Sequence, residues 1–161
     1  MAWQWRAFDD LSGADLYEAL KLRQAVFVIE QNCIFPDLDG ADQESFHLLG
    51  WLGHGAQRTL VAYLRCLPAG VKFVECSIGR VVSSPAARGT GIGKQLVEEG
   101  LRRTMALFPG QAIRIGAQQR LERFYADFGF VTDSAPYDED DILHVEMLRP
   151  GDAAPVAAAI G

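Results

Sequence analysis

The chain has 161 residues, of which 49% are hydrophobic and 22% are charged, and its formal net charge is -6 at pH 7. This length suits one domain with a sizeable core, and the composition excludes wholesale disorder. The negative charge argues against nucleic acid as a partner, because binding to the phosphate backbone requires lysines and arginines clustered on one face.

The N-terminal part of the chain predicts a strand, a helix and an irregular loop. Residues 3–8 alternate aromatic and polar side chains, which is typical of a strand. Ser12 is placed to cap a helix whose apolar residues recur at helical spacing to about Glu30. The acidic stretch 32–44 has no period, because a proline and a glycine interrupt it. We expect this stretch to be a loop that faces the substrate.

The remainder predicts further strands and two helices. The helices are expected at residues 91–108 and 121–128, and Gly129 ends the second. An acidic turn is expected at 137–141. The strands are expected at 45–52, 59–66, 71–82, 112–117, 130–132 and 142–148. This order predicts an α/β (α+β) mixed sheet with a parallel strand–helix–strand crossover, in one domain over 1–150, followed by a mobile Ala/Pro tail over 151–161.

Targeting segments, disulfides and metals are not expected. The N-terminus lacks the basic and apolar regions of a signal peptide, and no apolar run approaches the roughly 20 residues of a membrane span. The three cysteines have no C-x-x-C spacing, which indicates neither a disulfide framework nor a zinc knuckle. An EF-hand is excluded because Leu48 stands where the loop that starts at Asp37 needs a glutamate. We therefore expect a cytoplasmic protein with reduced thiols, no metal and no membrane partner.

A glycine-rich segment at residues 88–96 follows an apolar strand and opens a helix. Gly89, Gly91 and Gly93 occur at alternate positions, so successive N–H groups are free to turn toward one anion at the positive end of the helix. The segment is not a P-loop, because Gln95 follows Lys94, and its spacing differs from the Rossmann fingerprint. It predicts a pyrophosphate site. A glycine-rich turn that only caps the helix is the alternative.

Two motifs resemble the landmarks of the GNAT superfamily of N-acyltransferases. The first is R-x-x-G-x-G, formed by Arg88, Gly91 and Gly93, and the second is F-Y-x-x-F-G-F at 124–130. The stretches 23–33, 37–40, 78–81 and 116–118, with the late His144, are similar to the ElaA-like branch. The resemblance runs from the first helix to about Arg149. It implies a GNAT-type sheet with a splayed pair of parallel strands, and acetyl-CoA as the co-substrate.

The resemblance also assigns residues to acyl-CoA. The backbone of Val81 and Val82 would pair with pantetheine and hold the thioester carbonyl. Many family members carry Asn where this chain has Gln118, which we include as a candidate pantetheine contact. The glycine loop would bind the pyrophosphate, and its candidate residues are Arg88, Gly89, Thr90, Gly91, Gly93 and Lys94.

Acyl transfer to an amine needs an acid for the departing thiolate and a base for the amine. Tyr125 lies four residues before Gly129, where the family places its general acid; a purely packing role is the alternative. Glu30, His47 and His144 are the candidate bases, and we favour Glu30 and His144. A histidine within a strand is often only a packing residue.

These residues predict an N-acetyltransferase that acts on a primary amine of a small molecule or peptide by direct attack in a ternary complex. A non-catalytic acyl-CoA-binding or sensing module is the alternative, and a homodimer is possible. The acidic stretches 37–42 and 138–141 are either solvated turns or charges that attract a cationic amine to the acceptor mouth. Cys33 has no histidine nearby in sequence, so we expect it to be structural.

Overall fold

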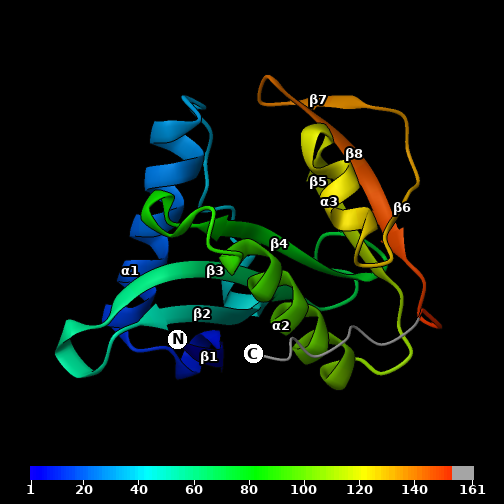
Figure 1. The fold of residues 1–161 in the computed structure, drawn as a ribbon. Helices are drawn as coiled ribbons and strands as arrows, with labels where there is room; N and C mark the ends of the chain where they lie inside the picture. Colours follow the sequence, from blue (N-terminus) through cyan, green and yellow to red (C-terminus); the bar gives the residue numbers. More distant parts are fainter. Residues whose placement is uncertain (154–161) are drawn as a thin grey trace.

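The computed structural model describes residues 1–153 and is built around one mixed sheet with helices on both faces (Figure 1). The strands are β1 (Ala2–Ala7), β2 (Phe46–Leu52), β3 (Thr59–Leu67), β4 (Cys76–Ser83), β5 (Ile113–Gln118), β6 (Val131–Thr132), β7 (Tyr137–Glu139) and β8 (Ile142–Arg149). Their order is β1-β2-β3-β4-β5-β8-β6, with β7 paired to β8. Among these described strands only β4 and β5 pair in parallel, and the other pairs are antiparallel. The predicted mixed sheet is confirmed, and most of the predicted tail, 154–161, lies outside the described residues.

The helices are α1 (Gly13–Arg23), α2 (Ile92–Leu107) and α3 (Glu122–Ala126). Alternation along the strands decides which face each helix covers, because successive side chains point to opposite faces. Leu49 and Tyr63 pack with the apolar face of α1, whereas Leu48 and Leu64 pack with Ile92 at the start of α2. The helices α1 and α2 thus cover opposite faces of the N-terminal half of the sheet.

Helix α1 begins as predicted and ends in an unusual geometry. The Ser12 hydroxyl accepts a hydrogen bond from the Asp15 N–H at 3.0 Å, which confirms the cap. Beyond Arg23 the chain continues as a π-helix over Gln24–Glu30. Such wide turns are rare and occur often at functional sites. The predicted end at Glu30 is therefore confirmed, although the last two turns are not α-helical.

Two expectations about the strands and turns are wrong. The strand predicted at 71–82 begins only at Cys76, because Gly70 adopts a left-handed φ of 85° and its N–H donates to the Phe73 carbonyl in a turn. The acidic segment expected as a turn at 137–141 is mostly hairpin: Tyr137–Glu139 forms β7 and pairs with β8. Only Asp140 and Asp141 form the turn, and both have a positive φ, as a two-residue type I′ hairpin loop requires.

The acidic loop 37–42 is not the solvated turn that composition suggested. Asp37 and Asp42 are 5% and 6% exposed, and both bind the fully buried Arg23 at 2.9 and 2.8 Å. Arg65, from β3, pairs with Asp39 and Asp42 and holds the pKa of Asp39 well below its usual range. These carboxylates are paired with arginines, so their negative charge is largely balanced within the chain.

His47 lies at the centre of this buried cluster. Its Nδ1 is 2.7 Å from the Tyr63 hydroxyl and its Nε2 is 2.9 Å from the Asp42 carbonyl. Both nitrogens are used, and the ring has no exposed surface. His47 is therefore a satisfied core residue and not a catalytic base.

The burial of His47 predicts a pH-dependent stability. Desolvation lowers the pKa of the folded imidazole, whereas the unfolded chain titrates near ~6.5. The unfolded state therefore binds more protons as the pH falls below ~6.5, and the free energy of unfolding should decrease through that window. Urea denaturation at several pH values between ~5 and ~8 measures this slope. His47→Gln keeps a donor and an acceptor without titrating, and a slope as steep as the parent's in that variant would contradict the assignment.

Candidate active site

Strands β4 and β5 part soon after they meet. They pair only at Cys76 with Ile113 and at Ser77 with Arg114. Beyond that point β4 stays with β3 and β5 stays with β8, so the two halves of the sheet diverge (Figure 1). Along the rest of these facing edges, the backbone N–H and C=O groups of β4 and β5 form no hydrogen bonds between the two strands. An extended amide-bearing ligand is able to pair with such edges as an added strand.

A β-bulge lies in β4 beside this splay. Tyr63 pairs with Val82 and Arg65 with Gly79, so the single residue between them on β3 faces both Arg80 and Val81. Arg80 has a φ of +50°. The left-handed region costs a non-glycine residue about 1–2 kcal/mol, so the surrounding contacts must hold it there. Val82 is buried against the core, and Val81 is partly buried.

The glycine loop has the geometry of an anion site. Gly89 and Gly91 have φ values of 77° and 83°, and Gly91 precedes the 16-residue helix α2 with no side chain capping it. A Cβ added at Gly89, Gly91 or Gly93 would meet no atom within 4 Å. Packing therefore does not require these glycines, and open space lies where side chains would stand. The unfilled space and the uncapped helix end fit a pyrophosphate.

The polar residues of this loop are partly engaged. The Arg88 guanidinium forms a two-point ion pair with Glu30, with Nη2 at 3.1 Å from Oε2, and this hydrogen bonding lowers the pKa of Glu30. The Thr90 hydroxyl donates to the Ala87 carbonyl and closes the turn. Lys94 is mostly exposed and lies 3.9 Å from Glu98. Glu30, predicted as a base, therefore stands at the glycine loop.

Tyr125 occupies a mostly apolar position on α3. The residue is 6% exposed and packs edge-on against Phe124 and Phe130, with ring centroids 5.1 and 6.0 Å away. Among the described residues its hydroxyl has no hydrogen-bond partner, yet it is not one of the buried polar atoms without a partner. The oxygen therefore keeps some contact with solvent. Burial of the ring raises the pKa of the phenol, which keeps it protonated.

His144 and Gln118 face each other in the β5–β8 ladder, at the far end of β5. The His144 Nδ1 is 2.7 Å from the Ile142 carbonyl, so Nδ1 carries a proton, and in the neutral ring the lone pair lies on Nε2. Nε2 is 3.6 Å from Glu139. The Gln118 amide donates to Gln31 at 3.2 Å. It also accepts from a nearby arginine, so its side chain is engaged within the chain itself.

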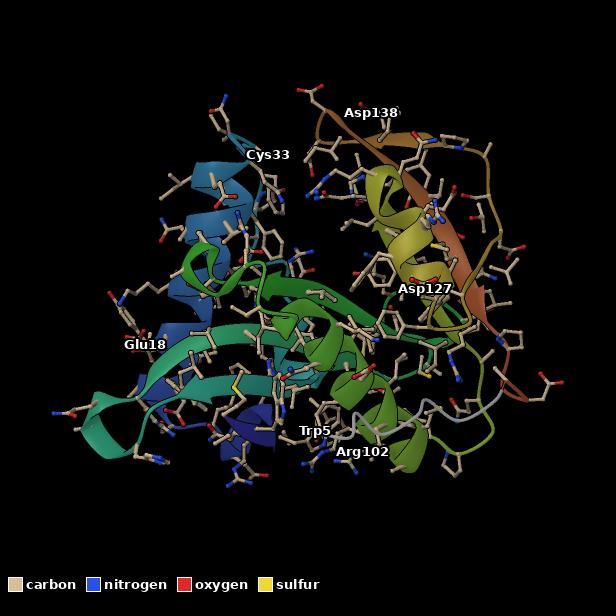
Figure 2. The ribbon with its side chains drawn as sticks, viewed as in Figure 1. Trp5, Glu18, Cys33, Arg102, Asp127 and Asp138 are labelled. Atoms are coloured by element: carbon tan, nitrogen blue, oxygen red, sulfur yellow. The ribbon has the colours of Figure 1, made fainter. Side chains whose placement is uncertain are left out.

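The segment that follows the π-helix contacts the β7–β8 hairpin. The Cys33 thiol donates to the Asp140 carbonyl at 3.2 Å, and burial raises the pKa of that thiol. Figure 2 shows Cys33 and Asp138 at the same end of the molecule, on the segment after the π-helix and on the β7–β8 hairpin. Trp5 and Arg102 lie at the other end. Cys33 thus has a structural contact, as expected.

The structure adds residues that sequence reasoning missed. Gln31 and Arg120 bind the Gln118 amide, and Arg80 occupies the bulge. Arg80 belongs to the stretch that carries the family resemblance, but only its φ and its partners show a role. Within residues 1–153, no three His, Cys, Asp or Glu side chains gather as a candidate metal site. None of the helices in that range combines the length and apolar character of a membrane span.

Comparison with known proteins decides the family. Residues 55–149 match the domain described as "Acetyltransferase (GNAT) domain". The chain belongs to the GNAT family of acetyltransferases. Protein ElaA of Escherichia coli is 40% identical over 149 residues, which cover 91% of this chain and 95% of ElaA. A UPF0039 protein of Synechocystis is also 40% identical, over 91% of this chain and 93% of its own length. The resemblance to the ElaA-like branch is thereby confirmed.

Solved GNAT structures agree with the fold. A Pseudomonas aeruginosa protein described as an acyl-CoA N-acyltransferase superposes with a TM-score of 0.86 at 39% identity, covering 92% of this chain and 98% of that one. The E. coli ElaA structure gives 0.84 at 39% identity, with the same coverage. An aminoglycoside 6′-N-acetyltransferase complexed with coenzyme A gives 0.64 at 14% identity over 94% and 99% of the two chains, which shows the fold alone. The chain therefore shares the fold of these proteins, with the expected splayed sheet.

Proposed function

We propose that this GNAT protein transfers an acetyl group from acetyl-CoA to a primary amine by direct attack in a ternary complex. One observation carries the proposal: the glycine loop at the start of α2 follows β4, the strand whose free edge opens beside β5, with only the short 3-10 turn Pro85–Ala87 between them. Together they offer a site for a pyrophosphate and for an extended pantetheine arm. A protein of the same fold, the aminoglycoside 6′-N-acetyltransferase, is described as complexed with coenzyme A, so this fold is able to accommodate the proposed ligand.

In this proposal each part of acyl-CoA has its own contacts. Backbone N–H groups of Gly89, Gly91 and Gly93 receive the pyrophosphate, with Lys94 and Arg88 supplying charge. The backbone of Val81 and Val82 holds the pantetheine and polarises the thioester carbonyl. If Arg88 binds a phosphate of acyl-CoA, its ion pair with Glu30 must first break. Gln118 is already bound by Gln31 and Arg120, so its contact with pantetheine requires a rearrangement.

Tyr125 is the proposed acid and His144 the favoured base. The phenol is protonated and its oxygen reaches solvent, so it is able to give a proton to the departing thiolate. In the neutral ring, with the proton on Nδ1, the Nε2 atom that lies near Glu139 carries the lone pair that accepts a proton from the ammonium of the acceptor, directly or through water. Glu30 remains the second candidate, but its ion pair with Arg88 engages both of its carboxylate oxygens.

The base assignment predicts a change in the pH dependence of turnover. An imidazole base must be neutral, so kcat of the parent should fall on acidification. We expect His144→Gln to lower kcat by about 10²-fold and to remove that acidic limb, because glutamine accepts no proton. Glu30→Gln is the matched variant and should keep the limb. Loss of the limb in Glu30→Gln alone would transfer the role to Glu30.

The reaction itself is tested by thiol release. Purified protein is mixed with acetyl-CoA and a panel of polyamines, amino acids and peptides with free N-termini, and free thiol is measured over time. Amine-dependent release supports the transferase. Binding of CoA without release with any amine would favour the alternative, a module that senses acyl-CoA. We place the reaction in the cytoplasm, because the three cysteines are free thiols, as reducing compartments favour.

A further inference from the structure

The strained bulge residue Arg80 is held by the loop that follows α1. Its Nε donates to the Asp37 carboxylate at 2.8 Å, and its Nη2 donates to the Asp37 carbonyl at 3.0 Å. The guanidinium also lies 3.4 Å from Asp39 and over the Phe35 ring, 5.5 Å from its centroid. A flexible side chain is thus fixed on several sides by one loop. Arg80 thus combines the positive φ of the bulge with a side chain that this loop anchors.

The anchor is itself rigid. Asp37 is 5% exposed, and its second carboxylate oxygen accepts from Arg23 at 2.9 Å. The Asp37 carbonyl also accepts from Arg23. Arg23 has no exposed surface and is fixed further by Asp42. A continuous set of charged hydrogen bonds therefore runs from the end of α1 through Asp37 to the bulge.

We infer that the Asp37–Arg80 ion pair positions the bulge of β4 and so sets the affinity for the pantetheine arm of acyl-CoA. This inference rests on the proposed function, in which the backbone of Val81 and Val82 binds pantetheine. Arg80 is then a positioning residue: its guanidinium faces Asp37, while its peptide group leads into Val81. Without the tether, the left-handed φ of Arg80 has less to hold it. The free edge of β4 would then sample several arrangements, and binding would have to order it.

The decisive variant is Arg80→Gly. Glycine accepts a φ of +50° without strain but also adopts many other values, so the bulge keeps its freedom to form and loses what fixes it. Asp37 keeps its contacts with Arg23, so the protein should still fold, with a thermal midpoint lowered by the loss of the Arg80 hydrogen bonds. Calorimetry with CoA should show a loss of affinity of about 10-fold or more. Calorimetry with phospho-ADP, the nucleotide fragment of CoA that lacks pantetheine, should show no change, because that fragment contacts the glycine loop.

Two further variants sharpen the test. Arg80→Lys keeps a positive charge within reach of Asp37, and it should recover part of the lost affinity. Arg58→Ala is the matched control: Arg58 pairs with Asp15 and stacks on Trp51, 3.9 Å from the ring centroid, at the other end of the sheet. This variant removes an arginine that, like Arg80, is ion-paired and lies over an aromatic ring, and it should leave CoA binding unchanged.

Each outcome has a distinct meaning. Parental CoA affinity in folded Arg80→Gly would overturn the inference and leave the proposed function intact. Equal weakening of CoA and phospho-ADP would also overturn it, because a local effect on β4 would not reach the glycine loop. A parent protein that binds no CoA would remove the proposed function and this inference together. Selective loss for CoA, with partial recovery in Arg80→Lys, supports the positioning role.

Discussion

Replacing Tyr125 with phenylalanine should lower kcat by about 10²-fold while leaving the affinity for CoA near the parent's value. The substitution removes only the hydroxyl, which has no hydrogen-bond partner among the described residues, and it keeps the ring that packs against Phe124 and Phe130. The protein should therefore fold with nearly unchanged stability. Steady-state kinetics, calorimetry and thermal unfolding measure the three quantities separately.

The pH profile adds a second criterion for Tyr125. Burial raises the pKa of the phenol above its ordinary value, so the acid stays protonated throughout a practical assay range. An alkaline limb that belongs to Tyr125 is therefore not expected below pH ~10. The raised pKa also makes the proton harder to transfer. We therefore expect the decrease in kcat to lie at the lower end of the range that loss of a general acid usually produces. A folded Tyr125→Phe protein with parental kcat would leave water or the acceptor's own ammonium as the proton source.

A valine in the glycine loop should abolish most CoA binding. The valine side chain of Gly91→Val would enter space where no atom lies within 4 Å, the same space that the pyrophosphate is proposed to occupy. We expect the CoA dissociation constant to rise about 10²-fold, since close backbone approach and several hydrogen bonds to a charged group are lost. Part of any stability change comes from the left-handed φ of 83°, which costs valine about 1–2 kcal/mol.

Two matched variants separate strain from ligand blocking. Gly110 lies just past the other end of α2, also has a left-handed φ, 74°, and also has open space around it. Gly110→Val should show similar strain and bind CoA normally. Gly93 lies in the first turn of α2 without a left-handed φ, so Gly93→Val should fold without strain and still lose CoA. Parental CoA affinity in both Gly91→Val and Gly93→Val would show that the loop only begins a helix.

Local patterns in the sequence determined most of the elements and the two motifs of the family. Backbone dihedral preferences and side-chain periodicity act over a few residues, so the glycine loop, the cap at Ser12 and the helix with Tyr125 are readable from short stretches. The expected strand at 71–75 failed because a turn at Gly70 outweighs the apolar run. The hairpin that contains β7 was missed because acidic residues are rare in strands.

Only the tertiary structure decided which charges are free. Arg88 meets Glu30 across 58 residues, Arg80 meets Asp37 across 43, and His47 meets Tyr63 across two strands. Pairings over such distances depend on the packing of α1 and its loop against the sheet, and no local period encodes them. They turned an apparently solvated acidic loop into a buried ionic cluster and an apparent base into a core histidine. The chemistry of each side chain is written in the sequence, but its availability depends on the partners that folding brings to it.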